Sequence, residues 1–93
     1  MSEAAAGNVQ LGRVEGIDTA EELLLRLRTA AEGSDAVQID GSQVISLDST
    51  TLQMLLAFRR DLVAEGVKVE WLDPSKKLKK TAGLLGLLEE LNL

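Results

Sequence analysis

The chain has 93 residues, of which 45% are hydrophobic and 27% are charged, and its formal net charge is −5. A chain of this length forms one domain with one modest core, and its acidic balance argues against general nucleic-acid binding because it repels phosphates. Histidine and cysteine are both absent, so disulfides, thiolate metal sites and the usual general base are excluded.

Residues 1–7 are small and acidic, and we expect them to form a flexible leader before a single domain over residues 8–93. The start lacks the basic and apolar regions of a signal peptide, which favours a cytoplasmic location. No stretch approaches the roughly 20 apolar residues of a membrane span, so we expect no direct membrane insertion. An imperfect alternation of apolar and polar residues over positions 8–14 then predicts a short edge strand.

A first helix is predicted to begin at Thr19, because Thr19 and Glu22 have the spacing of a capping box. Apolar residues then recur at helical spacing and form one stripe: Ala20, Leu23, Leu24, Leu27, Ala30 and Ala31. Gly33 supplies the left-handed residue that ends such a helix. Residues 36–40 follow as a short strand, in which Val37 and Ile39 share one face.

The second half repeats this alternation of strand and helix. After a polar connection over residues 41–46, a second helix is predicted to end at Gly66 and to present one apolar face: Leu52, Leu55, Leu56, Leu62 and Val63. Met54 and Phe58 widen this face. Residues 67–72 form the clearest strand, with Val67, Val69 and Trp71 on one face.

A third helix is predicted after the turn at residues 73–75, with its apolar stripe at Leu78, Ala82 and Leu85 and a final short turn behind it. Its lysines are expected to form a solvated face, with contact to an acidic partner as the alternative: Lys76, Lys77, Lys79 and Lys80. The whole order, βαβαβα, predicts an α/β fold with a small parallel or mixed sheet packed against helices.

Catalytic patterns are missing from the sequence. There is no glycine-rich phosphate loop and no nucleophile elbow. The neighbouring carboxylates Glu21/Glu22 and Glu89/Glu90 do not face each other on a helix, so neither pair makes a shared site. We therefore expect a protein that is not an enzyme, with no catalytic residues, no cofactor and no metal site.

Four consecutive oxygen-bearing side chains, Asp48, Ser49, Thr50 and Thr51, stand directly before the apolar part of the second helix. Such residues are typical helix caps, because they satisfy the free N–H groups of the first turn. The same helix end tolerates a phosphoryl group on a hydroxyl, and this would add nearly two negative charges beside Asp48. Both interpretations remain open from the residues alone.

The central region resembles the STAS family, which includes the bacterial anti-sigma-factor antagonists. The resemblance lies in the strand Ala36–Asp40, the run Val44-Ile-Ser-Leu-Asp48-Ser-Thr, the strand after Gly66, and the helix that closes on Gly86-Leu87. It covers roughly residues 9–91 and implies a STAS-like fold. Thr51 stands where the family motif has glycine, and one predicted strand rather than two precedes the first helix.

The resemblance implies a non-enzymatic partner-switching regulator. It would act like the anti-sigma-factor antagonists or take part in chemotaxis signalling. Ser49 would be the phosphorylated residue, and Asp48, Ser49, Thr50 and Thr51 would form the partner-binding site. The partner would be a kinase-type anti-sigma factor or a signalling kinase. The alternative is a constitutive small STAS subunit bound to the ATPase of a phospholipid-trafficking ABC transporter. A small-molecule or nucleotide binder has little support in the sequence.

Overall fold

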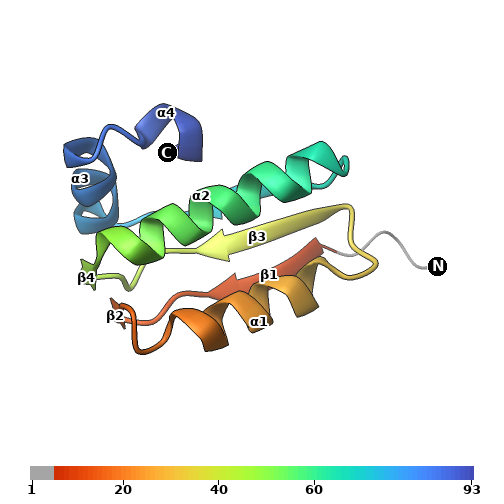
Figure 1. The fold of residues 1–93 in the computed structure, drawn as a ribbon, viewed down its shortest axis with the longest axis horizontal. Helices are drawn as coiled ribbons and strands as arrows, with labels where there is room; N and C mark the ends of the chain where they lie inside the picture. The colour runs from red at the N-terminus through yellow and green to blue at the C-terminus, as the bar shows by residue number, and fades with distance from the viewer. Residues whose placement is uncertain (1–5) are drawn as a thin grey trace.

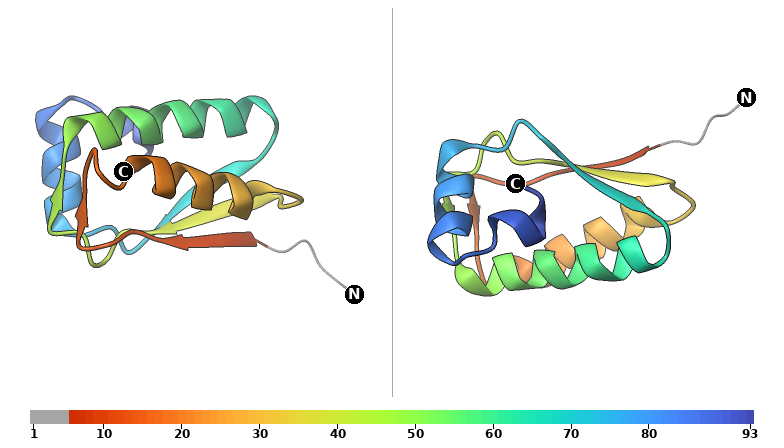
Figure 2. Two further views of the ribbon diagram at one scale, coloured as in Figure 1. Left: turned by 60° about the horizontal axis from the view of Figure 1, so that its bottom comes forward. Right: turned by 90° about the horizontal axis from the view of Figure 1, so that it is seen from above.

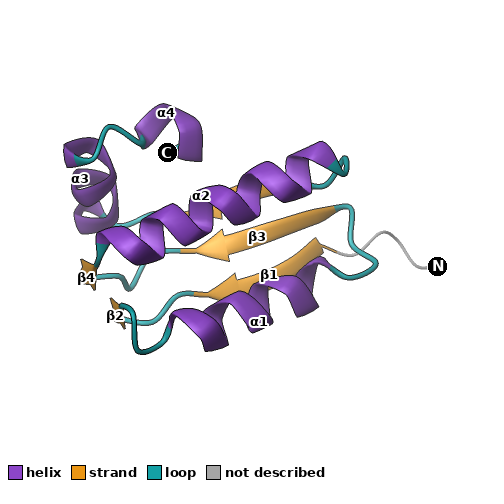
Figure 3. Ribbon diagram, viewed as in Figure 1, coloured by secondary structure: helices purple, strands orange, loops and turns teal. Residues whose placement is uncertain are grey.

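The computed structural model describes residues 6–93, in which short strands alternate with helices (Figures 1 and 3). The strands are β1 (Ala6–Gln10), β2 (Val14–Glu15), β3 (Ala36–Asp40), β4 (Ser46–Leu47) and β5 (Lys68–Leu72). The helices are α1 (Ala20–Ala31), α2 (Ser49–Ala64), α3 (Lys76–Leu84) and α4 (Leu88–Leu91). The predicted α/β class is confirmed. None of the helices in this part of the chain is long and apolar enough to cross a bilayer.

The main sheet has the strand order β1-β3-β5, and both pairings are parallel. A second small sheet joins β2 to β4, also in parallel. The single strand expected over residues 8–14 is therefore wrong, because two strands occupy this region. The break between them has a physical cause: the Gly12 N–H donates to the Glu15 carboxylate at 2.6 Å, which turns the chain. β4 likewise occupies the end of the expected polar connection.

The expected leader over residues 1–7 falls mostly outside the described residues. Ala6 and Gly7 belong to β1, so this strand begins two residues before the predicted boundary of the domain.

Helices α1 and α2 lie over the same face of the main sheet (Figure 2). This face is apolar, since Val9, Val37, Ile39 and Val69 are all buried. The opposite face is polar, and there the Gln38 amide donates to the Glu70 carboxylate at 3.3 Å. The period of two in each strand thus separates a core face from a solvated one. The α1 stripe is confirmed, with Leu23 and Leu27 at its buried centre.

The helix ends agree with the sequence at the glycines and differ at Thr19. Gly33 and Gly66 both have positive φ, as the predicted left-handed stops require. Thr19 is the N-cap of α1, but its side chain makes no cap hydrogen bond. Its hydroxyl instead donates to the buried Glu15 carboxylate at 2.8 Å, so the predicted capping box is wrong.

Helix α2 buries Leu52, Leu55, Leu56 and Leu62, as predicted, and also Phe58. Val63 was expected on the same face but is half exposed. Val63 lies in the last turn of α2, one residue before the helix ends at Ala64.

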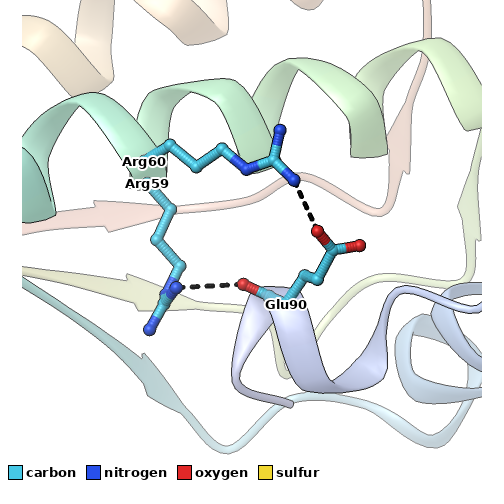
Figure 4. A network of polar contacts seen from close by, with 3 residues as sticks. All are labelled: Arg59, Arg60 and Glu90. Carbon is cyan, nitrogen blue, oxygen red and sulfur yellow. Dashed lines mark hydrogen bonds and ion pairs between the residues drawn. The ribbon is translucent and has the colours of Figure 1, made fainter.

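The C-terminal segment is fastened to α2 and β5. The Arg59 guanidinium donates to the Glu90 carbonyl at 3.0 Å, and Arg60 forms an ion pair with the Glu90 carboxylate (Figure 4). The Trp71 indole N–H donates to the Leu91 carbonyl at 2.8 Å. Arg59 and Arg60 therefore serve to hold α4, together with the buried Leu91 side chain.

Candidate functional site

The candidate site lies where β4 ends and α2 begins. Asp48 is the N-cap of α2, and one of its carboxylate oxygens accepts from the Thr51 N–H at 2.8 Å. The other oxygen accepts from the Ile17 N–H at 3.0 Å. One carboxylate therefore joins the start of α2 to the turn between β2 and α1, which lies 31 residues earlier in the chain.

These two contacts also set the charge of Asp48. The Thr51 backbone N–H is the main cause that holds the pKa of Asp48 below its usual value, and the Ile17 N–H acts in the same direction. Hydrogen bonds to the ionised form stabilise that form. The site thus carries a fixed negative charge at neutral pH.

Ser49 and Thr50 are exposed at the first two positions of α2. None of the side-chain hydrogen bonds found within residues 6–93 engages either hydroxyl, because Asp48 caps the helix in their place. The capping role that their residue types allowed is thus taken by Asp48. Both hydroxyls face solvent beside the positive end of the helix.

Thr51 was expected to take part in partner binding, and the structure places its side chain below the surface. Its side chain is fully buried, since the third position of α2 turns inward beside Leu52. Its hydroxyl has no hydrogen-bond partner within the described residues. Asp48, Ser49 and Thr50 remain together on the surface, and Thr51 lies beneath them.

An apolar rim, defined here as Val14, Ile17 and Ile45, lies on the backbone segments next to this surface. Their side chains are 62%, 71% and 49% exposed, respectively. The backbone brings them together: Val14 pairs with Ser46, the Ile45 N–H donates to the Arg13 carbonyl at 2.8 Å, and Ile17 is held by Asp48. The sequence does not predict the rim, because Val14 and Ile45 stand in an expected strand and an expected connection, and Ile17 belongs to no predicted element.

Glu15 holds the base of this rim. It is only 5% exposed, and its carboxylate accepts from the Gly12 N–H and from the Thr19 hydroxyl. These contacts fix both ends of the segment that carries Val14 and Ile17. A buried carboxylate with satisfied oxygens makes such a segment rigid.

A groove in the described part of the chain lies elsewhere. Its volume is about 490 Å³, and it is open between the last turns of α1 and α2, next to Phe58 and Leu62. It therefore lies at the opposite end of α2 from Ser49. The exposed hydroxyls belong to a surface rather than to an enclosed pocket.

The chain is similar to a known protein family and to a solved structure. A family model described as "Mlab, STAS domain" matches residues 2–92. The fold is similar to the solved structure of the anti-sigma factor antagonist SpoIIAA in its unphosphorylated form, with a TM-score of 0.74 and 19% sequence identity. That match covers 94% of this chain and 77% of the other, and at this identity it shows the fold alone. No curated protein matches the sequence significantly.

Proposed function

The chain belongs to the STAS-domain family, and on that premise we propose that it is a partner-switching regulator controlled by phosphorylation of Ser49. It acts by binding and carries out no reaction of its own. Its partner is a protein kinase of the anti-sigma-factor or signalling type. The observation that carries this proposal is the exposed Ser49 hydroxyl, which makes no hydrogen bond within residues 6–93 because Asp48 caps the helix.

Electrostatics explains how a phosphate would act there. The group would add nearly two negative charges next to the ionised Asp48. The helix N-terminus would tolerate it, so the fold would persist. The contact surface around it, with its apolar rim, would then carry these charges in addition to the charge of Asp48. A partner that buries this surface would then bind more weakly, because the charge loses its hydration in the contact.

The first experiment is a tagged pull-down from native cell extract, with mass spectrometry of the bait and of the recovered protein. We expect a kinase-type partner and phosphate on Ser49 in part of the bait. Affinity for that partner is then compared between Ser49→Ala and Ser49→Asp. The first variant should stay within about threefold of wild type, and the second should bind at least about tenfold more weakly, which is about 1.4 kcal/mol.

Ser42→Asp is the matched control. Ser42 is also exposed, and its N–H donates to the Asp40 carboxylate, so the variant adds the same charge beside another ionised Asp. It should bind like wild type. Equal affinities for Ser49→Ala and Ser49→Asp would rule out the switch.

The apolar rim favours a second candidate, a permanent subunit of a transporter or signalling complex. Exposed apolar patches are typical of protein contacts, and obligate contacts are the more hydrophobic ones. In this case Ser49 and Thr50 would be contact residues, and the partner would be the ATPase of an ABC transporter. Stoichiometric co-purification of such an ATPase with unmodified Ser49 would support this candidate over the switch.

A further inference from the structure

The surface of α3 differs in charge from the rest of the chain. Four of the ten basic residues lie on this helix, and all fifteen acidic residues lie outside it. Lys76, Lys77, Lys79 and Lys80 are all exposed. The only ion pair within residues 6–93 joins Arg60 to Glu90, so the four ammonium groups have no carboxylate partner there.

The same helix presents an unusual apolar side chain. Leu84 is 78% exposed, more than any other large hydrophobic side chain in the described residues. Lys77, Lys80 and Leu84 are spaced i, i+3 and i+7, so they share one side of the helix. We call this set the lysine–leucine face. The core does not use it, because Leu78 and Ala82 make the buried side of α3.

The face is held rigidly and lies near the candidate site. Ser75 caps α3 by accepting from the Leu78 N–H at 3.1 Å, and its hydroxyl donates to the Val44 carbonyl at 2.7 Å. Val44 precedes β4, which leads directly to Asp48. Figure 1 shows α3 standing beside β4 and the first turn of α2, at one end of the molecule. Helix α3 and the candidate site therefore lie at the same end of the molecule.

We propose that the lysine–leucine face docks an acidic helical segment of a partner protein, whose carboxylates pair with Lys77 and Lys80 and whose apolar side chain covers Leu84. Complementary charge steers such a segment to the face, and the apolar contact retains it. The proposal deepens the proposed function by naming the chemistry of the partner, and it rests on that function only in requiring a protein partner.

An anionic membrane surface would be attracted to the same lysines but fits less well. Binding of an amphipathic helix to a membrane grows with the apolar area that it buries. The two apolar residues on the inner side of α3 are already committed to the core, which leaves Leu84 and the partly exposed Leu85. Glu89 and Glu90 follow closely in α4 and would be repelled by an anionic surface. A protein segment, in contrast, can place its carboxylates opposite the lysines of α3 and away from the glutamates of α4.

The test is a titration of the ¹⁵N-labelled full chain with two synthetic helical peptides of equal length, followed by NMR. One peptide carries glutamates and leucines, and the other carries lysines in place of the glutamates. We expect the acidic peptide alone to shift amide signals of residues 76–85. Its affinity should fall at least about fivefold between about 50 and 300 mM salt, because exposed charges are screened.

Matched variants locate the contact. The double variant Lys77→Glu/Lys80→Glu should bind the acidic peptide at least about tenfold more weakly, and Leu84→Ser about threefold more weakly. The controls are Lys68→Glu on β5 and Leu25→Ser on α1, since both side chains are exposed and lie away from α3. Both controls should bind like wild type. All these positions are exposed, so the variants should fold, as the NMR spectra themselves would verify.

Three outcomes would overturn the proposal: no shift of amide signals in α3, equal shifts from both peptides, or an equal loss of peptide affinity in the control variants. Tight binding of wild type to phosphatidylglycerol vesicles, lost in the double lysine variant, would assign the face to a membrane and overturn it as well. The experiment uses neither Ser49 nor the natural partner, so its failure is distinguishable from failure of the phosphorylation switch.

Discussion

Asp48 combines two roles that the sequence could not separate. It caps α2 through Thr51, and it holds the turn that carries Ile17. The first role is predictable from residue type, since aspartate before a helix is a common cap. The second joins residues 31 positions apart and depends on the parallel pairing of β2 with β4. Local pattern carries no information about such a contact.

The charge on Asp48 predicts how stability depends on pH. Its pKa is lowered in the folded chain by the Thr51 and Ile17 N–H groups. The stabilisation is therefore fully present above the unfolded pKa of about 3.9, and it is lost as the pH falls through the lower folded value. Asp48→Asn should lower the urea midpoint at pH 7.

The difference in urea midpoint between wild type and Asp48→Asn should shrink as the solution is acidified below about pH 4. Urea titrations of wild type and variant at both pH values measure it. Asp18→Asn is the control, because Asp18 is an exposed aspartate in the neighbouring turn and makes no side-chain hydrogen bond within the described residues. A deficit of Asp48→Asn that is unchanged in acid would contradict the assigned role of the charge.

Thr51 makes a second prediction at the scale of one residue. Its buried hydroxyl has no hydrogen-bond partner in the described structure, and a buried unsatisfied polar group costs about 1–3 kcal/mol. Thr51→Val keeps the branched shape and removes the hydroxyl, so the free energy of unfolding should rise by about 1 kcal/mol. Thr50→Val at the neighbouring exposed position should change it by less than about 0.5 kcal/mol. A destabilised Thr51→Val would mean that the hydroxyl makes a favourable contact in the folded chain.

At the scale of elements, α4 shows how a very short helix is kept in place. Four residues do not form a stable helix alone, so its attachment must come from tertiary contacts. Leu91 is fully buried, whereas the ion pair between Arg60 and Glu90 is exposed on both sides. Burial should therefore contribute more than the ion pair.

Substituting one residue of each contact tests which contact contributes more to stability. Leu91→Ala should lower the free energy of unfolding by about 2–4 kcal/mol, because it removes buried methyl groups and leaves a cavity. Arg60→Ala should lower it by less than about 1 kcal/mol, as is typical for exposed ion pairs. Urea denaturation followed by fluorescence of Trp71, the only tryptophan, measures both. Comparable losses would mean that the ion pair holds the segment.

The elements differ in how far their sequences predicted them. α2 and β5 were predictable, because leucines at helical spacing and alternating valines determine which face is buried. β2 and β4 were not, since two-residue strands carry no periodicity and exist only through pairing with each other. The capping box failed for a related reason: Glu15, adjacent to the predicted strand, competes for the Thr19 hydroxyl. The rim of the candidate site depends on these same short strands, so it was not predictable either.

At the scale of the whole molecule, every pairing within the two sheets is parallel. Ala6 pairs with Ala36, Ala36 with Lys68, and Val14 with Ser46, so each pair joins residues at least thirty positions apart. Proteins dominated by such distant pairings fold more slowly than helical bundles of equal length. Refolding followed by Trp71 fluorescence should therefore take milliseconds or longer. A microsecond phase with full amplitude would contradict this expectation.

The parallel topology also bears on how the chain is made. A ribosome releases the N-terminal strand first, and no strand with which it can pair exists until some thirty more residues have emerged. The central strand, β3, can then pair with its second neighbour, β5, only after a similar length of chain has been released. The nascent chain thus exposes an unpaired strand edge until residues 68–72 have emerged, and only then is its main sheet complete.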